Sequence, residues 1–382
     1  MTIPLLSALF VVLASAYPEN PASALGHVLL LEADSSKPYP LWNTVGYMAD
    51  IGDDVNGFTY MKNGIFGGFP AHYEILPFYE KIGQYSDMEN RDLWLYPLRI
   101  SGEELKRFKD TLSVWAEREY PYMFFNINCV DGIYDILKYT LDSIPKAPPV
   151  LTPQNFVVLL GNSGRLGAPI HFHAGDSITA EHSKYNLPHK YIRFDFGIGF
   201  KKEFYFQLNF MPLLHDLKDR PIFYTPFAEF EVLSLSMNFN GKNLKISEFR
   251  LLKMQSLSPR EPISYLVNAG IVPGEVDLGI GQSFQLAHSV YAGLLIRNST
   301  IQKNEEYKNL TGARIFFGSS SSRIWRWGLY CENMQDFTEI TQIITINSWL
   351  ALDISRNLSI YTEGKWSGKN EYSVNIMSRF YF

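Results

Sequence analysis

Apolar and polar side chains alternate along much of the second half of the chain, in short stretches separated by turn residues. The last stretch alternates most clearly. Its apolar face carries Val374, Ile376, Phe380 and Phe382, and its polar face carries Asn375, Arg379 and Tyr381. Side chains two residues apart share one face of a β-strand, so this pattern predicts a strand with one apolar and one wetter face. Twelve stretches predict strands, at residues 191–200, 203–210, 227–239, 244–254, 276–286, 290–298, 312–317, 324–332, 339–345, 349–355, 358–365 and 372–382.

These strands predict an all-β antiparallel barrel, and the chain end favours one that crosses a membrane. Such a barrel presents apolar side chains to lipid at alternate positions and aromatic side chains near both interfaces. Aromatic residues stand at several predicted strand ends, including Trp325, Trp349 and Trp366. The terminal Phe382 resembles the C-terminal signature of bacterial outer-membrane barrels. We expect a transmembrane barrel, while a soluble β-sandwich or β-barrel, which gives the same spacing, stays open.

The first half of the chain mixes helix and strand and predicts an α+β domain. Residues 27–32 form a short apolar stretch typical of a buried strand. A helix is predicted from Ser101 toward Glu119, because a hydroxyl stands at the N-cap position and carboxylates follow in the first turn. Apolar residues at helical spacing predict a second helix over residues 130–141.

A proline-rich stretch at residues 143–149 separates the two halves. Proline cannot continue a helix, so this stretch predicts a stiff linker. We expect an N-terminal domain over residues 17–145 and a barrel domain over residues 150–382.

The chain begins with an apolar run that resembles a signal peptide. Residues 3–16 have the length of a signal-peptide core, and Ala14-Ser15-Ala16 supplies small residues before a cut ahead of Tyr17. We therefore expect residues 1–16 to be a signal peptide, although a buried N-terminal strand or helix is the alternative. No later stretch reaches 18 consecutive apolar residues, so no helical membrane span is predicted.

Composition narrows the classes of partner. The net charge of -5 lacks the basic footprint of a nucleic-acid-binding protein. The two cysteines, Cys129 and Cys331, make neither a disulfide framework nor a zinc-site spacing. His171 and His173 could share one side of a strand, but no third metal ligand is evident. No metal and no cofactor is predicted.

Other polar residues predict structural roles. Arg91 and Asp92 predict a half-buried ion pair. His215, with Asp216 and Asp219, predicts a structural turn.

Cys129 is the strongest candidate for chemistry. It stands just before, or in the first turn of, the second predicted helix. The N–H groups at a helix N-terminus carry partial positive charge, which lowers a thiol pKa and favours the thiolate. This position predicts a nucleophile, with a buried structural cysteine as the alternative. His27 follows Gly26 and opens a predicted strand, so it is a candidate base, with a core histidine as the alternative. Together the two residues predict thiol acyl transfer.

Five short blocks sharpen this prediction. They are residues 17–27 (YPENPASALGH), residues 64–69 (GIFGGF), Tyr85, residues 89–96 (ENRDLWLY) and Asn128-Cys129. In this order they resemble the Lnb-type lipoprotein N-acyltransferase family over roughly residues 17–142. The resemblance implies a papain-like fold in the permuted arrangement, with His27 before Cys129 as the catalytic pair. Residues 213–219 and 256–259 resemble the β-rich C-terminal region of many such proteins, whereas other members carry transmembrane helices there.

The activity that the resemblance implies is lipoprotein N-acylation. A phospholipid would give its acyl chain to Cys129, and the α-amine of a diacylated lipoprotein's N-terminal cysteine would then receive it. Asn128 is predicted as a helix cap or an oxyanion donor. Tyr85 and Lys62 are predicted to orient His27 or contact a phosphate, with a solvated surface role as the alternative.

The implied location is the bacterial outer membrane, with the N-terminal domain in the periplasm. Two other function classes stay open. One is a thiol-dependent lipid or amide hydrolase, and the other is a non-enzymatic barrel that acts as a channel or anchor beside a binding module.

Overall fold

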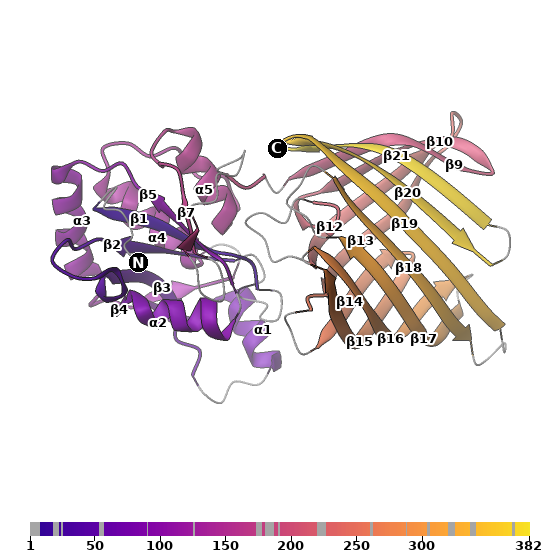
Figure 1. Ribbon diagram of the computed structural model, residues 1–382, viewed down its shortest axis with the longest axis horizontal. Coiled ribbons are helices and arrows are strands. Elements are labelled where there is room, and N and C mark those ends of the chain that lie inside the picture. Colours follow the sequence, from indigo (N-terminus) through magenta and orange to yellow (C-terminus); the bar gives the residue numbers. More distant parts are fainter. Residues whose placement is uncertain are drawn as a thin grey trace. The chain divides into compact units, whose positions relative to one another are not determined.

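A computed structural model of the chain describes residues 8–17, 23, 26–52, 57–89, 91–124, 127–172, 178–179, 187–189, 192–219, 227–259, 263–287, 289–303, 306–319, 325–336, 341–368 and 371–382. The chain forms two compact units, Met1–Pro188 and His189–Phe382. Figure 1 shows that the first is an α+β unit and the second a β-barrel. Among the described residues, no helix is both long and apolar enough to cross a membrane.

The N-terminal unit is built on an antiparallel sheet flanked by helices (Figure 1). Its described strands run in the order β6 (Tyr120–Tyr122), β4 (Phe69–Pro77), β3 (Asn43–Ala49), β2 (His27–Glu32), β1 (Leu9–Ala14), β5 (Leu93–Pro97), β7 (Ile170–Phe172) and β8 (Ile178–Thr179). Its helical segments are η2 (Tyr39–Leu41), α1 (Gly57–Phe66), α2 (Phe78–Lys81), the π-helical η3 (Ile82–Met88), α3 (Gly102–Trp115), α4 (Cys129–Thr140) and α5 (Pro153–Asn162). The predicted strand is β2, and the two predicted helices are α3 and α4.

Both predicted helices begin where their capping residues indicate. At the start of α3, the Glu104 N–H donates to Ser101 Oγ at 3.2 Å, and the Ser101 N–H donates to Glu104 Oε2 at 2.8 Å. This reciprocal pair satisfies two donors that the helix itself cannot satisfy. The helix ends at Trp115, before the predicted Glu119, and the chain turns there.

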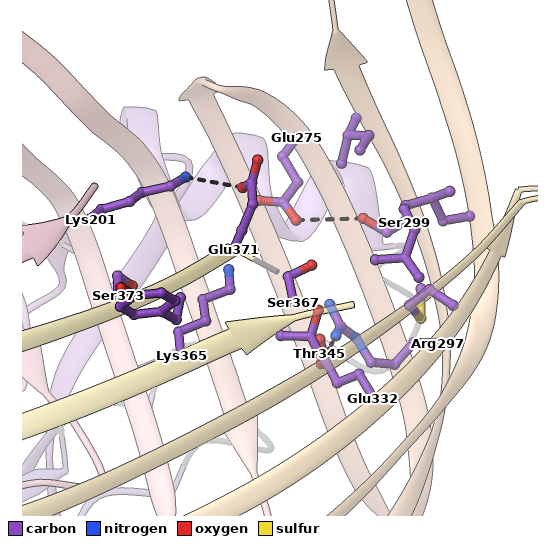
Figure 2. Close-up of a pocket in the computed structure, with 15 residues that line it drawn as sticks. Lys201, Glu275, Arg297, Ser299, Glu332, Thr345, Lys365, Ser367, Glu371 and Ser373 are labelled. Atoms are coloured by element: carbon purple, nitrogen blue, oxygen red, sulfur yellow. Dashed lines mark hydrogen bonds and ion pairs between the residues drawn. The ribbon is translucent and has the colours of Figure 1, made fainter. Parts of the chain in front are cut away.

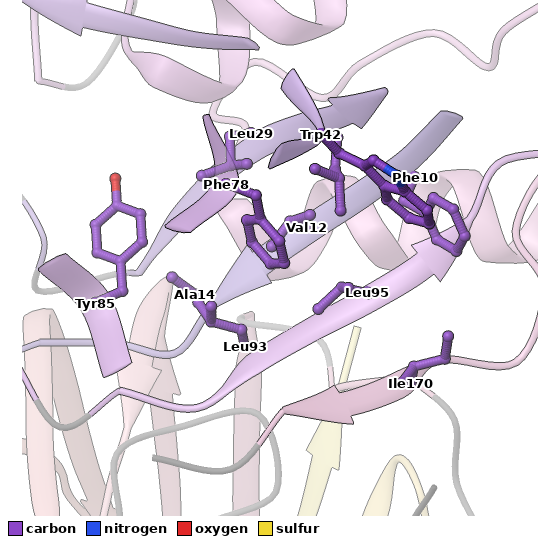
Figure 3. Close-up of a cluster of buried hydrophobic side chains, with 11 residues drawn as sticks. Phe10, Val12, Ala14, Leu29, Trp42, Phe78, Tyr85, Leu93, Leu95 and Ile170 are labelled. Atoms are coloured by element: carbon purple, nitrogen blue, oxygen red, sulfur yellow. The ribbon is translucent and has the colours of Figure 1, made fainter. Parts of the chain in front are cut away.

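Strand β1 lies in the middle of the sheet, between β2 and β5, and all six of its residues are buried. Its Phe10, Val12 and Ala14 join the hydrophobic core drawn in Figure 3, with Leu29 from β2 and Leu95 from β5. A cut ahead of Tyr17 would remove this strand and expose the core. The structure thus shows residues 9–14 as the buried strand that was the alternative, and the signal peptide over residues 1–16 stays a prediction.

The N-terminal unit extends beyond the predicted boundary at residues 143–149. These residues have no regular structure, as expected, but the chain then returns to the same unit as α5 and β7. Thr152 caps α5, because the Asn155 N–H donates to Thr152 Oγ1 at 3.2 Å. Apolar residues such as Phe156 are fully buried. The apolar face of α5 needs the first unit as its packing partner, so the division between the units lies at Pro188 instead of near residue 148.

Twelve strands of the second unit close into a barrel. They are β9 (Arg193–Lys201), β10 (Glu203–Met211), β12 (Ala228–Phe239), β13 (Leu244–Ser256), β14 (Ser264–Val272), β15 (Gly274–Ala287), β16 (Val290–Lys303), β17 (Glu306–Ser319), β18 (Trp325–Asp336), β19 (Thr341–Ser355), β20 (Leu358–Ser367) and β21 (Glu371–Tyr381). Each pairs antiparallel with its neighbour, β21 pairs with β9, and β10 pairs with β12. The ring therefore closes, and the short β11 (Leu213–His215) adds to β12 at one end.

The predicted barrel is confirmed, but two of its strands were assigned wrongly. Strand β14 was not predicted, because Gly270 and Pro273 at its end interrupt the strand pattern. Strand β19 was predicted as two strands, at residues 339–345 and 349–355, whereas one strand runs from Thr341 to Ser355. Because one strand was missed and another was counted twice, the predicted number of barrel strands is still twelve. The predicted starts at residues 191, 324 and 339 lie outside the described residues.

The barrel is apolar outside and polar inside. On β15, Asp277 is 2% exposed, whereas its neighbours Val276 and Leu278 are 55% and 53% exposed. The same alternation places charged residues in the interior and apolar ones outside on the other strands; the buried ones include Asp195, Arg297, Arg326 and Arg379, and the exposed ones Ile198, Ile280, Ile296 and Ile376. An outer surface of this kind is stable only against lipid.

The predicted aromatic girdles are confirmed in part. Trp325 and Trp366 are exposed near strand ends, as expected. Trp349 is buried and belongs to an interior cluster with Tyr361 and Met377, because its position in β19 is an inward one.

A turn at residues 216–219, called here the luminal turn, folds into the barrel interior. The Asp216 N–H donates to Asp219 Oδ2 at 2.8 Å, which confirms the predicted structural turn. Leu217 packs against both interior hydrophobic clusters, one that includes Tyr291 and one that includes Tyr361. Lys218 binds Glu363 of β20 at 3.1 Å. The turn therefore fills part of the lumen at the end where β9 begins, which we call the proximal end.

Candidate functional site

Cys129 is the first residue of α4, and Asn128 caps that helix. The side-chain oxygen of Asn128 accepts from the N–H groups of Val130 at 2.8 Å and Asp131 at 3.4 Å. Asp131 completes a capping box by accepting from the Asn128 N–H at 3.0 Å. The Asn128 amide nitrogen donates to the Phe124 carbonyl at 3.2 Å. The structure thus shows the capping role predicted for Asn128, and its oxyanion role stays a prediction.

The Cys129 thiol meets the first residues of β2. It is 5% exposed, and the backbone N–H of Val28 donates to its sulfur. Burial, with a smaller contribution from the nearby Asp131 carboxylate, raises the pKa of the thiol to about 11. The expected lowering by the helix N-terminus is therefore outweighed, because desolvation of a buried thiolate is the larger effect.

His27 lies directly before Val28, so β2 brings both candidate catalytic residues to one place. Burial, together with the positive charges of Arg91 and Lys81, lowers the pKa of the imidazole to about 3. The ring is neutral at pH 7 and can accept a proton. Its Nε2 is buried and has no hydrogen-bond partner among the described residues.

Gly26 allows this close packing. Its φ is +91°, and a Cβ there would lie 2.8 Å from the Ala14 carbonyl oxygen and 3.1 Å from Gln154 Nε2. Only glycine fits without strain, and it lets β1 and α5 approach the backbone directly before His27. Gln154, fully buried on α5, was missed because it lies beyond the predicted domain boundary.

Tyr85 and two buried cations surround the imidazole. The Tyr85 ring lies 5.7 Å from the His27 ring, and the Arg91 guanidinium lies 4.7 Å from the Tyr85 ring centre. Figure 3 shows Tyr85 at the edge of the core cluster, with its hydroxyl pointing away from the other side chains drawn. This hydroxyl is buried and has no hydrogen-bond partner within the described part of the chain. Burial raises the Tyr85 pKa, so the hydroxyl remains a donor.

Arg91 is held rigidly, though not by the predicted partner. It donates to the Ser15 carbonyl at 2.7 Å and binds Glu89 at 2.7 Å. Asp92 instead lies 3.3 Å from His171. The prediction of an Arg91–Asp92 pair is wrong, because each of the two charged groups faces a different partner.

The remaining candidates lie apart from this arrangement. Lys62 is exposed on α1, in contrast to the buried Cys129 and His27. His171 stacks on Trp94 with the ring centres 3.8 Å apart. His173, the second member of the predicted metal pair, lies outside the described residues.

The barrel has a cavity of its own, of about 320 Å³, near the end where β9 and β10 meet. Figure 2 shows charged side chains of both signs pointing into it, with Lys201 paired to Glu371. Such mixed charges do not select one class of ligand, so the buried pair in the N-terminal unit is the stronger candidate site.

Comparison with known proteins identifies the domains. Residues 187–381, which are 195 of the 382 residues, match the family model described as a domain of unknown function (DUF7840). The chain belongs to the DUF7840 family. In this DUF7840 protein, residues 2–157 also match the Lnb N-terminal periplasmic domain. The expected resemblance is thus confirmed as a domain match, and the match includes β1. None of the curated proteins compared with the chain matches it.

Solved structures similar to this DUF7840 protein are barrels. The KdgM porin is 10% identical over 50% of this chain and 99% of its own, with a TM-score of 0.34. The NanC porin is 8% identical over 49% and 98%, with a TM-score of 0.34. An outer membrane channel from Pseudomonas putida F1 is 8% identical over 54% and 100%, with a TM-score of 0.33.

The location follows from the two units together. The N-terminal unit matches a periplasmic domain, and the barrel has a lipid-facing outer surface. This DUF7840 protein is therefore an outer-membrane protein with a periplasmic N-terminal domain.

Proposed function

We propose that this protein is a lipoprotein N-acyltransferase. It would move a fatty acyl chain from a phospholipid, through a thioester on Cys129, to the α-amine of a lipoprotein's N-terminal cysteine. The proposal rests mainly on one observation. The Cys129 sulfur contacts the start of β2, and His27 is the first residue of that strand. The match to the Lnb N-terminal periplasmic domain supports the same assignment.

In the first half-reaction, His27 accepts the thiol proton as the sulfur attacks the ester carbonyl carbon. The bond from that carbon to the alcohol oxygen breaks, and the leaving oxygen takes the proton from His27. In the second half-reaction, the amine attacks the thioester and the carbon–sulfur bond breaks. The amine proton passes through His27 to the sulfur, which restores the thiol.

The electrostatics of the resting site fit this sequence. Because the thiol pKa is about 11 and the imidazole pKa is about 3, both groups are neutral before substrate binds. The proton therefore moves only as the sulfur attacks, and a buried neutral thiol does not activate water in the meantime. The Tyr85 hydroxyl, which is buried and has no hydrogen-bond partner in the part of the chain that the structure describes, supplies a donor for the oxyanion or the ester.

The barrel supports a role as an anchor. The luminal turn fills part of its interior, which favours attachment to the membrane over free diffusion through the lumen. The predicted phosphate contact of Lys62 stays a prediction.

Mass spectrometry of the full chain in phospholipid vesicles tests the proposal. We expect an acyl adduct on Cys129 that disappears when a synthetic diacylated lipopeptide is added, with the acyl group recovered on the peptide amine. Cys129→Ala abolishes the adduct, and His27→Gln slows its formation by at least about a hundredfold, the usual scale of general-base catalysis. Cys331→Ser, the matched control, leaves it unchanged, because Cys331 is exposed in the barrel.

The outcomes separate the function classes. If water alone removes the adduct and no acylated peptide forms, the protein is a hydrolase and not a transferase. An adduct that persists in Cys129→Ala, or none in the natural protein, would reject thiol catalysis and favour a binding or anchoring role.

A further inference from the structure

Two histidines and an aspartate converge at the proximal end of the barrel. His189, His215 and Asp219 are 7%, 7% and 2% exposed. His189 Nε2 lies 4.0 Å and His215 Nδ1 lies 3.9 Å from the same carboxylate oxygen, Asp219 Oδ2. One candidate ligand atom from each residue lies within 4.8 Å of the others. Two imidazole nitrogens facing one carboxylate oxygen form the kind of donor set that binds zinc.

The two oxygens of Asp219 have different surroundings. Oδ1 accepts from Arg379 and from the Tyr381 hydroxyl. Oδ2 faces the two imidazoles; it also accepts from the Asp216 N–H at 2.8 Å and lies 3.8 Å from Arg193 Nη1. A metal-ligating carboxylate is commonly oriented in this way, with outer hydrogen bonds on one oxygen and the ion on the other.

The charged groups around the cluster carry a net negative charge, which a bound cation would neutralise. Asp195 binds Arg193 at 3.1 Å and Arg379 at 3.2 Å. Asp216 binds the same two arginines at 2.8 and 2.9 Å. These two carboxylates balance the two guanidinium groups, so Asp219 is a third negative charge.

Two nearby cations of the described residues pair elsewhere and do not balance this third charge. Lys218 binds Glu363 at 3.1 Å, and Arg326 binds Asp353 at 2.7 Å. A buried carboxylate without a matching charge is costly, and a bound cation removes that cost.

We propose that His189, His215 and Asp219 bind one divalent transition-metal ion, with zinc as the best fit. A point equidistant from three atoms with these separations lies at most about 2.5 Å from each, so shifts of roughly 0.4 Å give the 2.0–2.2 Å typical of zinc ligands. The ion would join the chain before β9, the short β11 and the luminal turn. It would therefore fix the turn that fills the lumen.

Cobalt(II) and zinc titrations of the untagged full chain in detergent test this proposal. We expect one equivalent of cobalt to give the intense visible absorption of a four-coordinate site, and zinc to displace it. His215→Gln and His189→Gln each weaken zinc binding at least tenfold. His72→Gln is the matched control, because His72 is exposed on β4 of the other unit, and it leaves binding unchanged.

Three results would overturn the proposal. The natural protein could bind less than one equivalent at micromolar zinc, the His72 variant could lose as much affinity as the other two, or a cobalt–thiolate absorption band could place the ion at a cysteine. Gel mobility before and after heating reports whether each variant barrel is folded. If neither variant folds, X-ray absorption of the zinc-loaded natural protein decides, because two imidazoles in the first shell support the site and none rejects it.

Discussion

In the N-terminal unit, Val12 and Leu29 are fully buried and charged residues such as Lys106 lie at the surface. In the barrel, Arg326 is fully buried and Ile280 is 58% exposed. The hydrophobic effect acts on both units, but water surrounds the first and lipid surrounds the second. Apolar groups leave water in both, but in the barrel they do so by facing lipid, while the polar groups pair with one another inside.

The two units also differ in how their buried charges are paired. In the barrel, interior carboxylates and guanidinium groups meet in networks such as that of Asp195, Asp216 and Arg379. In the N-terminal unit, Arg91 and Lys81 are buried singly beside His27, each with one carboxylate partner. Burial is the main cause of the lowered His27 pKa, and the positive charges of Arg91 and Lys81 add to it because they disfavour the imidazolium form.

The largest expected effect comes from a charge in the apolar core of the N-terminal unit. Val12→Asp buries an unpaired carboxylate in β1 and costs more than about 5 kcal/mol, which unfolds the unit. Limited proteolysis should then digest the N-terminal unit and spare the barrel. Val114→Asp is the control, because Val114 is 49% exposed on α3 and water receives the charge. Resistance of the Val12 variant to proteolysis would contradict β1 as a core strand.

A charge on the outer surface of the barrel has the next largest effect. Ile280→Arg places a guanidinium against lipid and destabilises the barrel by about 2–4 kcal/mol. Denaturant unfolding in lipid vesicles measures this loss. The matched Val114→Arg, at a similarly exposed site, changes stability by less than about 0.5 kcal/mol. Equal effects at the two sites would show that the barrel faces water.

Acid should weaken the N-terminal unit through His27. Its folded pKa of about 3 is below the ordinary 6.5, so the unfolded chain binds more protons between these values. Stability that is present above pH 6.5 is therefore lost as pH falls toward 3, by up to about 1.4 kcal/mol per pH unit. Asp131, whose pKa is raised to about 6, acts in the opposite direction between pH 4 and 6.

Thermal unfolding of the unit from pH 7 to pH 4 checks this prediction. The His27→Gln variant should show a smaller slope than the natural protein. An identical slope in both would remove His27 as the cause.

The smallest effect distinguishes two glycines of the N-terminal unit. Gly26→Ala combines a positive φ with a close carbonyl oxygen and should cost about 2 kcal/mol, with displacement of His27. Gly52→Ala has a φ of +70° but open space around it, so only the strain of about 1 kcal/mol remains. Melting temperatures of the two variants give the difference. Similar melting temperatures would argue that Gly26 does not pack against β1.

Short sequence patterns were sufficient to predict the features that depend only on neighbouring residues. The hydroxyl of Ser101 and the amide of Asn128 cap the helices they were expected to cap, because capping needs only residues within one turn. Alternation with a period of two predicted the closed barrel, because each strand must present one face to lipid. The pattern failed at β14, where glycine and proline interrupt it, and within β19, which was divided in two.

The N-terminal apolar run shows where local signals end. Residues 9–14 are apolar, which suits both a signal peptide and a core strand. Hydrophobicity alone does not specify whether a segment enters a membrane or a protein core. Only the pairing with β2 and β5, both distant in sequence, shows these residues as a core strand in the folded unit.

The sequence by itself determined the classes of structure and the candidate chemistry: an α+β unit with Cys129 at a helix start, and a barrel with an apolar outer face. Only the tertiary structure decided the state of the groups in them. Burial in the folded unit set the pKa of Cys129 above its ordinary range, against the effect of the helix terminus alone, and set that of His27 below its ordinary range. Chain closure brought His189 and His215 to one oxygen of Asp219. Desolvation and charge pairing depend on everything that packs around a group, and the packing partners lie far away in sequence.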